Sequence, residues 1–532
     1  MAATLAAVSA RLIGDLTQPV VNYRVALVAD RLPLSLDPLV DATDPAVAAM
    51  SPLLYRSLLR LDASASPVPD LAAGMTTSLD GLTYRLTLRS GLHWSDGTAL
   101  TLQDVLATID WVQSHGFPGT SLASAWNGVD ATVSGATLTL SLATPRASFP
   151  VTMSQLPILP LGTMTHAAVA RLASESGTPL ATSGPYEVAG TNSSAITLVS
   201  NPYADARPRM GRVAVLPMGS FAAAAAAFAA GSVDAVLATT PAERAQLLRR
   251  SGSVAEDVTT FGFVDLIFNE RVQGLSDPVV RSAVNEAIDR TQIISGPLEG
   301  LGVPQYGPIP AGILWLGKAT ASALPNPQAA GAALTADGWA VGANGDRSRN
   351  GVALSFTLSV PDAAPLPQVA TGVASQLDAL GIATTVAIVP SGQFLSGVLL
   401  SAAFQLALAG WDNGADPDVS SYWLSTATPP AGFNVSGGPV DAFLDQDLTA
   451  LATRTSPPSS SMPRRRASSS AGRSPGRWSP RWAAPSATPP PGSGEGRTGE
   501  PARGRPGGVD PAVTRPGADT IGAPIVPGWW NW

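Results

Sequence analysis

The side chains that most often do chemistry in enzymes are scarce in this sequence of 532 residues. It has no cysteine, which excludes disulfides, thiolate metal sites and cysteine nucleophiles. His93, His115 and His166 are the only histidines, and they form neither an H-x-x-x-H nor an H-E-x-x-H spacing. Neither a G-x-S-x-G nucleophile motif nor a P-loop occurs. We therefore expect no catalytic residue, no bound metal and no cofactor.

Aromatic and acidic side chains gather instead near the end of the well-patterned part of the chain. An alternating strand over Phe404–Leu408 leads directly into this segment. The candidate ligand-binding residues are Trp411, Asp412, Asp416, Tyr422 and Trp423. The alternative is that Trp411 belongs to a hydrophobic core and that the aspartates only solvate a loop.

Composition and charge limit the classes to which the protein can belong. The chain is 45% hydrophobic and 13% charged, and its length suggests roughly three structural units of about 150 residues. No window holds the 18 or so uninterrupted apolar residues that a membrane-spanning helix needs. Residues 1–453 contain 21 basic and 35 acidic side chains, a net charge of −14. An acidic body of this kind argues against a nucleic-acid partner.

Local patterns predict helices and strands mixed along the whole chain. Tyr84, Leu86 and Leu88 alternate with polar residues, which predicts a half-buried strand over Thr83–Arg89. Thr101, with Asp104 three residues on, is typical of a capping box at a helix start. Further strands are expected at Tyr23–Val28, Thr137–Leu142, Leu354–Val360 and from Gly381, and further helices at Pro45–Leu59 (capped by Asp44), Asp277–Arg290 and Val369–Leu380. With no repeat of fixed period, the fold class is α/β.

A series of short motifs follows the order seen in one protein family. The strongest segment is Tyr84–Val105, in which a strand, Gly91, an aromatic pair and Asp96-Gly97 precede a helix that opens with Asp104-Val105. The other motifs are Leu36-Asp37-Pro38, Pro69-Asp70-Leu71-Ala72, Gly184-Pro185-Tyr186, Asn201-Pro202-Tyr203, Gly231-Ser232-Val233-Asp234, Phe268-Asn269, Ala287-Ile288-Asp289-Arg290, Gly410-Trp411 and Asp416-Pro417-Asp418. Over about residues 22–450 the chain resembles the extracytoplasmic solute-binding proteins of peptide/nickel ABC importers, the oligopeptide-binding-protein family (solute-binding family 5).

This resemblance implies a two-lobed periplasmic-binding-protein-like fold with a hinge. Residues 22–269 would form lobe I, with a sub-domain inserted at 45–165, and residues 270–452 would form lobe II. The Tyr84–Val105 segment would be scaffold rather than ligand contact, and Asp289 would tie a loop.

The resemblance also implies roles for the candidate site residues. In peptide-binding relatives the tryptophan matched by Trp411 lines the cleft, and an aspartate shortly after it pairs with the ligand's α-amino group. Asp412 is the nearest carboxylate, but the spacing departs from the family pattern and leaves Asp416 as a rival. Tyr422 and Trp423 would add aromatic side chains to the wall of the cleft. A buried carboxylate opposite an ammonium group makes a charge-assisted hydrogen bond and penalises ligands without that charge.

The two ends of the chain depart from the family pattern. Residues 1–21 read either as a signal or anchor clipped by a misplaced start or as a short cytoplasmic leader. Residues 453–532 are rich in proline and arginine and have no helical or strand period, which predicts a disordered tail. Two hypotheses account for that tail: a frameshift in GC-rich DNA, or a basic segment that binds an acidic partner.

The expected function is that of a solute-binding component of an ABC importer. The protein would work outside the cytoplasmic membrane as a monomer, with a lipid, N-terminal or peripheral attachment to the membrane. Its partners would be a small solute, an oligopeptide by preference, and the permease subunits. The alternatives are a family-like scaffold in envelope biogenesis and, disfavoured by the missing nucleophile motifs, an envelope hydrolase.

Overall fold

The computed structural model of the chain describes residues 22–453, with gaps at 34, 41–43, 116, 118–119, 173–179, 206–207, 258–259, 308–312, 314–323, 413 and 431, and residues 523–525. The predicted leader lies outside the described residues. So does the predicted tail, except for β20 (Ala523–Ile525), which pairs in parallel with β12 (Ala255–Asp257). At these three residues the structure departs from the prediction of a tail without regular structure.

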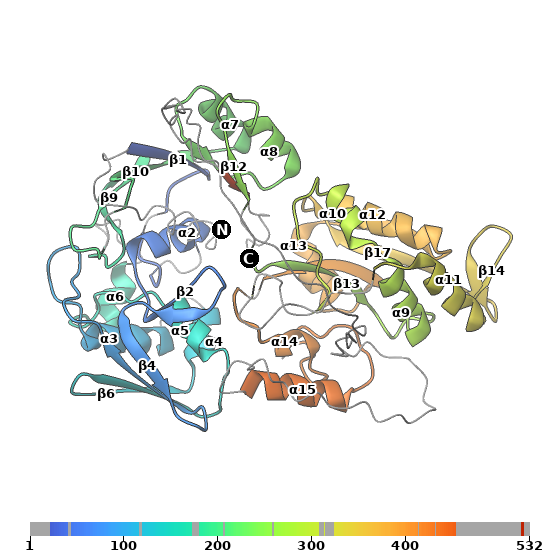
Figure 1. Cartoon of the computed structure of the whole chain (residues 1–532), viewed down its shortest axis with the longest axis horizontal. Helices are drawn as coiled ribbons and strands as arrows, with labels where there is room; N and C mark the ends of the chain where they lie inside the picture. The colour runs from blue at the N-terminus through green and yellow to red at the C-terminus, as the bar shows by residue number, and fades with distance from the viewer. Residues whose placement is uncertain are drawn as a thin grey trace, which may run out of the picture.

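The first sheet is five-stranded and mixed. Its order is β11-β1-β10-β9-β8, formed by Ala235–Val236, Asn22–Val28, Arg212–Met218, Ala195–Ser200 and Tyr186–Asn192. Strand β1 is parallel to β10 and β11, while β9 is antiparallel to both β10 and β8. Helices α7 (Phe221–Ala229) and α8 (Pro241–Leu247) lie beside this sheet (Figure 1).

A second, antiparallel sheet shares its hydrophobic core with the first. Its order is β4-β5-β7-β6, formed by Ala72–Thr77, Thr83–Leu88, Thr137–Leu142 and Val129–Ser134. The accompanying elements are α2 (Pro45–Leu54), β2 (Leu59–Leu61), β3 (Pro67–Pro69), α3 (Leu102–Gln113), α4 (Thr120–Trp126), α5 (Phe149–Gln155) and α6 (His166–Leu172). Residues from both sheets, such as Leu198 and Leu140, belong to one continuous cluster of buried side chains.

A third sheet has a core of its own. Its order is β13-β19-β17-β18, formed by Phe263–Phe268, Leu406–Trp411, Ser355–Pro361 and Ala383–Val389. Around it lie α9 (Pro278–Ala287), α10 (Arg290–Ser295), α11 (Pro327–Ala336), β14 (Ala340–Val341), β15 (Arg347–Arg349), β16 (Val352–Ala353), α12 (Leu366–Ala379), α13 (Ser391–Gln393) and the π-helix η2 (Phe394–Leu399). Helices α14 (Ser420–Trp423) and α15 (Ala442–Thr453) complete this part, which lies on the opposite side of Figure 1 from α2, α3 and β4.

The local start signals of helices are confirmed. The carboxylate of Asp44 accepts hydrogen bonds from the first turn of α2. Thr101 and Asp104 form the predicted capping box of α3. Asp277 caps α9, and Pro278 occupies its first position.

Two helix ends were predicted wrongly. Helix α2 ends at Leu54 rather than Leu59, because Tyr55 is extended (φ −129°, ψ 144°) and its hydroxyl is drawn to Asp37, 2.5 Å away. Helix α9 ends at Ala287 rather than Arg290, because Asp289 begins a new helix by capping α10.

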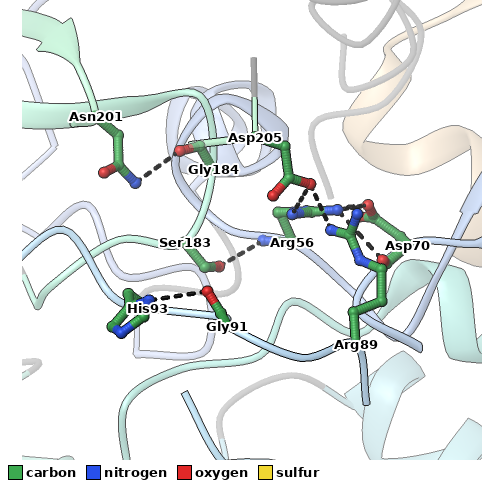
Figure 2. A network of polar contacts seen from close by, with 9 residues as sticks. All are labelled: Arg56, Asp70, Arg89, Gly91, His93, Ser183, Gly184, Asn201 and Asp205. Atoms are coloured by element: carbon green, nitrogen blue, oxygen red, sulfur yellow. Dashed lines mark hydrogen bonds and ion pairs between the residues drawn. The ribbon is translucent and has the colours of Figure 1, made fainter. Parts of the chain in front are cut away.

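Residues of the motifs that carry the family resemblance are connected to one another, either directly or through Arg56 and Asp205, which lie outside the motifs. The Arg56 guanidinium donates to the Asp70 carboxylate and to Asp205 (2.9 Å), and Arg89 donates to the same Asp205 oxygen (2.5 Å), as Figure 2 shows. In the same region Asn201 donates through its side-chain amide to the carbonyl of Gly184 (2.9 Å). These hydrogen bonds make the motif residues part of the scaffold.

The glycine of the Gly184-Pro185-Tyr186 motif is required by close packing. A Cβ at Gly184 would lie 2.6 Å from the carbonyl oxygen of Leu53 at the end of α2. The Tyr186 ring is fully buried, and its hydroxyl donates to the carbonyl of Met210 (2.8 Å). The motif therefore brings β8 and α2 together.

Candidate functional site

The central sheet of the third core positions the candidate site. Strands β13 and β19 are antiparallel, with Phe263 opposite Trp411 and Asp265 opposite Ala409. Every residue of β19 is buried, so the chain leaves the core only after Trp411. The indole therefore stands at the end of a buried strand, where the sequence placed it.

Trp411 is held from two sides. Its indole Nε1 donates a hydrogen bond to the carboxyl of Asp265, at 2.8 Å. Its ring packs against the rings of Tyr422 (centroids 4.9 Å apart) and Phe433 (5.8 Å). Tyr422 and Phe433 are themselves stacked, with centroids 5.7 Å apart and 26° between the planes. We call Trp411, Tyr422, Phe433 and Phe263 the aromatic cluster.

Two carboxylates lie close to the phenol of the aromatic cluster. Burial raises the pKa of Tyr422, and the negative charges of Asp412 and Asp265 raise it further. Asp412 is exposed, and one of its oxygens accepts a hydrogen bond from the backbone N–H of Gly414 (2.9 Å). The structure therefore brings Trp411, Asp412 and Tyr422 together.

Asp416 faces a different part of the molecule. Burial raises its pKa to about 6, although the carboxyl accepts hydrogen bonds from the backbone of Asp418 and from Ser148 and feels the charge of Arg146. Ser148 immediately precedes α5, so this aspartate joins the loop after β19 to the region of the second sheet. A nearby apolar contact, in which Ala65, Val151 and Ala415 are buried together, joins the same two regions.

Trp423 is the last residue of α14 and is half-buried. Its carbonyl oxygen accepts a hydrogen bond from the side-chain amide of Asn434, at 3.4 Å. A second bond from this amide reaches the carbonyl of Leu424 (2.9 Å). These contacts fasten α14, and with it Tyr422, to the chain around residue 434.

The sequence analysis missed Asp265, Phe263 and Phe433. Asp265 lies 146 residues before Trp411, and only the pairing of β13 with β19 brings the two together. One signal was available: a carboxylate stands between Phe263 and Ile267 at a position where strand alternation predicts an apolar side chain.

Two features are absent from the part of the chain that the structure describes. None of the helices described is both long and apolar enough to cross a membrane. In the same ranges, no group of three or more histidine, aspartate or glutamate side chains is arranged to hold a metal ion.

Comparison with protein families gives one extended match. Residues 66–432, more than half of the chain, match the family described as "Bacterial extracellular solute-binding proteins, family 5 Middle". The match includes β13, β19 and α14, which carry Asp265, Trp411 and Tyr422. It ends at residue 432, just before Phe433.

Two relatives show how far the similarity extends. Protein XP55 of Streptomyces lividans is 27% identical over 409 residues, which are 75% of this chain and 72% of that protein. The oligopeptide-binding protein OppA of Bacillus subtilis (strain 168) is 24% identical over 300 residues, 52% of this chain and 55% of OppA. The alignment thus spans about half the length of OppA.

The fold is matched by solved structures. The crystal structure of a nickel ABC transporter protein from Bacillus halodurans superposes with a TM-score of 0.67 at 19% identity, over 82% of this chain and 87% of that one. An identity this low shows the fold alone. The superposition confirms the predicted α/β class and the periplasmic-binding-protein-like architecture.

Proposed function

The chain belongs to the bacterial extracellular solute-binding proteins of family 5, and from this premise we propose that it captures a peptide and delivers it to a membrane permease. Membership makes it the substrate-binding protein of an ABC transporter and not an enzyme. The peptide, the mode of capture and the extracytoplasmic site of action are the proposed part. OppA, a relative, is named for oligopeptide binding, which supports this ligand class.

The observation that carries the proposal is the aromatic cluster with a carboxylate beside it. The half-buried Tyr422, packed against the buried Trp411, would offer apolar ring surface to a side chain of the ligand, and the exposed Asp412 would offer a negative charge to its α-amino group. Aromatic side chains contribute large contact area at a low cost in side-chain entropy. The pair would thus recognise the first residue of a peptide by shape and by charge.

Of the two aspartates considered, Asp412 suits this role better. Asp416 already accepts hydrogen bonds from Ser148 and Asp418 and lies in the field of Arg146. A ligand ammonium group at Asp416 would have to compete with that arginine. Asp412 is exposed and acts on Tyr422 of the aromatic cluster.

Capture would proceed by closure of two lobes around the solute, with the division placed before β13 rather than at residue 269, because β13 pairs with β19 in the third sheet. A ligand that contacts both lobes shifts the population toward the closed form by its difference in affinity for the two forms. Asp416 and Ser148 lie on opposite sides of this proposed division, so their hydrogen bond would belong to the closed form.

Calorimetry with the full chain tests the ligand assignment. Trialanine should bind, and N-acetyl-trialanine, which lacks the α-amino charge, should bind at least tenfold more weakly. Asp412→Asn should abolish this difference, whereas the matched Asp416→Asn should retain it. Equal affinity of the two peptides for the wild type would remove the amine-pairing role. Absence of binding by any peptide, with the fold intact, would favour the scaffold alternative.

A further inference from the structure

Asp265 is an ionisable side chain on an apolar face of a sheet. Strand alternation places it on the same face of β13 as Phe263 and Ile267, which both pack into one hydrophobic cluster. The other members of that cluster come from η2, from β19 and Phe404 just before it, from the end of β18, from Tyr422 of α14 and from Val435. The opposite residue on β19, Ala409, is small and fully buried.

The carboxyl of Asp265 is directed at Trp411. On an antiparallel pair, a residue and the diagonal neighbour of its cross-strand partner lie within reach of a long side chain. Trp411 is that neighbour, and its indole Nε1 is 2.8 Å from the Asp265 carboxyl. The small Ala409 leaves room for this diagonal contact.

In the described part of the chain, no cationic side chain influences the pKa of Asp265. The titratable group that faces it is the Tyr422 phenol, from α14, which also feels the charge of the Asp412 carboxylate after β19. Helix η2 and the chain near 435 present apolar side chains to this face. Burial raises the pKa of Asp265 to about 7, while the hydrogen bond from Trp411 lowers it.

We propose that Asp265 is a positioning residue: it fixes the Trp411 indole within the aromatic cluster, and its ionisation sets how firmly the indole is held. An ionised carboxylate accepts a hydrogen bond about twice as strong as that of a neutral acceptor. The indole is therefore held best when Asp265 is charged. The contact of Trp411 with the ligand rests on the proposed function. If Trp411 makes that contact, ligand affinity also depends on the ionisation of Asp265.

The direct test needs no ligand. The indole N–H signal of Trp411 is assigned in ¹⁵N-labelled full-length protein by its loss in Trp411→Phe. In the wild type its chemical shift should titrate with a midpoint near pH 7. In Asp265→Asn, which keeps a hydrogen-bond acceptor but not the charge, the shift should be flat. Asp130→Asn, which changes an exposed strand aspartate of β6, should titrate like the wild type.

A flat wild-type titration between pH 5 and pH 9 overturns the proposal, and so does an unchanged titration in Asp265→Asn. The wild-type curve alone decides the matter if the Asn variant does not fold.

The second test uses trialanine as the probe. Its affinity for the wild type, expressed per peptide with a protonated α-amino group, should fall by up to about tenfold from pH 8 to pH 5.5, and Asp265→Asn should lose most of that dependence. Equal pH profiles in the two proteins would overturn the link between Asp265 and affinity. Absence of trialanine binding at every pH would defeat the proposed function, and the indole titration would still decide the role of Asp265.

Discussion

Replacing Arg56 by methionine should destabilise the protein far more than the same change at Arg89, although both arginines bind Asp205. The Arg56 side chain is 17% exposed and the Asp70 side chain is 13% exposed, so the ion pair between them is largely withdrawn from water. The pair formed by Arg89 and Asp205 is 35% and 52% exposed. Burial lowers the pKa of Arg56, but its bonds to the two aspartates outweigh burial and keep the pKa raised.

The difference in burial sets the magnitude. Breaking a buried ion pair by removing one partner costs about 3–5 kcal/mol, because the other charge stays buried and unpaired. An exposed pair contributes about 0–1 kcal/mol. Arg56→Met should therefore lower the free energy of unfolding by about 3 kcal/mol or more, and Arg89→Met by less than about 1 kcal/mol. The double variant Arg56→Met/Asp70→Leu should recover part of the loss, because no buried charge is left unpaired.

Urea unfolding followed by circular dichroism at pH 7 measures both changes. Repeating it in 0.5 M salt adds a check, because screening acts mainly on the exposed Arg89 pair. Equal losses for Arg56→Met and Arg89→Met would refute the reasoning, since burial would then not control the strength of the network. A double variant less stable than Arg56→Met alone would refute it as well.

Three further predictions concern single residues. Gly184→Ala should destabilise the protein by at least about 2 kcal/mol, because the new Cβ would meet the Leu53 carbonyl. Gly190→Ala, whose Cβ would meet nothing within 4 Å, should leave stability unchanged. Thermal unfolding of the two variants compares them. Thr101→Ala should cost about 1 kcal/mol through loss of the cap of α3, as measured by urea unfolding. Asp265→Asn should remove a pH dependence of stability. The folded-state pKa of Asp265 is raised from 3.8 to about 7, so the wild type should lose up to about 4 kcal/mol of unfolding free energy as the pH rises from 4 through 7. Urea unfolding across that range should show a smaller loss in the variant.

Features encoded within a few residues could be predicted from the sequence. The cap formed by Thr101 and Asp104, and the cap of α9 by Asp277, depend on side chains next to the backbone that they satisfy. The strand at 137–142 was also predicted from alternation alone, with the bounds that the structure gives. Local hydrogen bonds and a two-residue period need no knowledge of the rest of the fold.

Helix ends that depend on distant partners could not be predicted in this way. Tyr55 leaves α2 because its hydroxyl bonds Asp37, 18 residues earlier. Asp289 was expected to tie a loop; its side chain instead caps α10, a helix that the apolar pattern did not separate from α9, and its backbone N–H donates to the side-chain oxygen of Gln376 (2.8 Å), 87 residues on. In both places a tertiary contact outweighs the continuing helical pattern.

The candidate site shows the same division. Trp411, Asp412 and Tyr422 lie within twelve residues of sequence, and the structure places them side by side; their role in ligand binding stays a prediction. Asp265 was missed because its position depends on the pairing of two strands far apart in the chain. The contact of Asp416 with Ser148, across about 270 residues, was equally invisible, and it is what favours Asp412 over Asp416.

The most direct test of the central claim is native mass spectrometry of the full chain, purified without added ligand. The mass of the complex is measured first, and the bound molecule is then dissociated and fragmented. The proposed function predicts a bound mass that fragments as a short peptide with a free α-amino group. Trp411→Ala, in the same preparation, should carry much less of it. A bound metal chelate or sugar would contradict the peptide assignment. A peptide retained equally by wild type and Trp411→Ala would contradict the site.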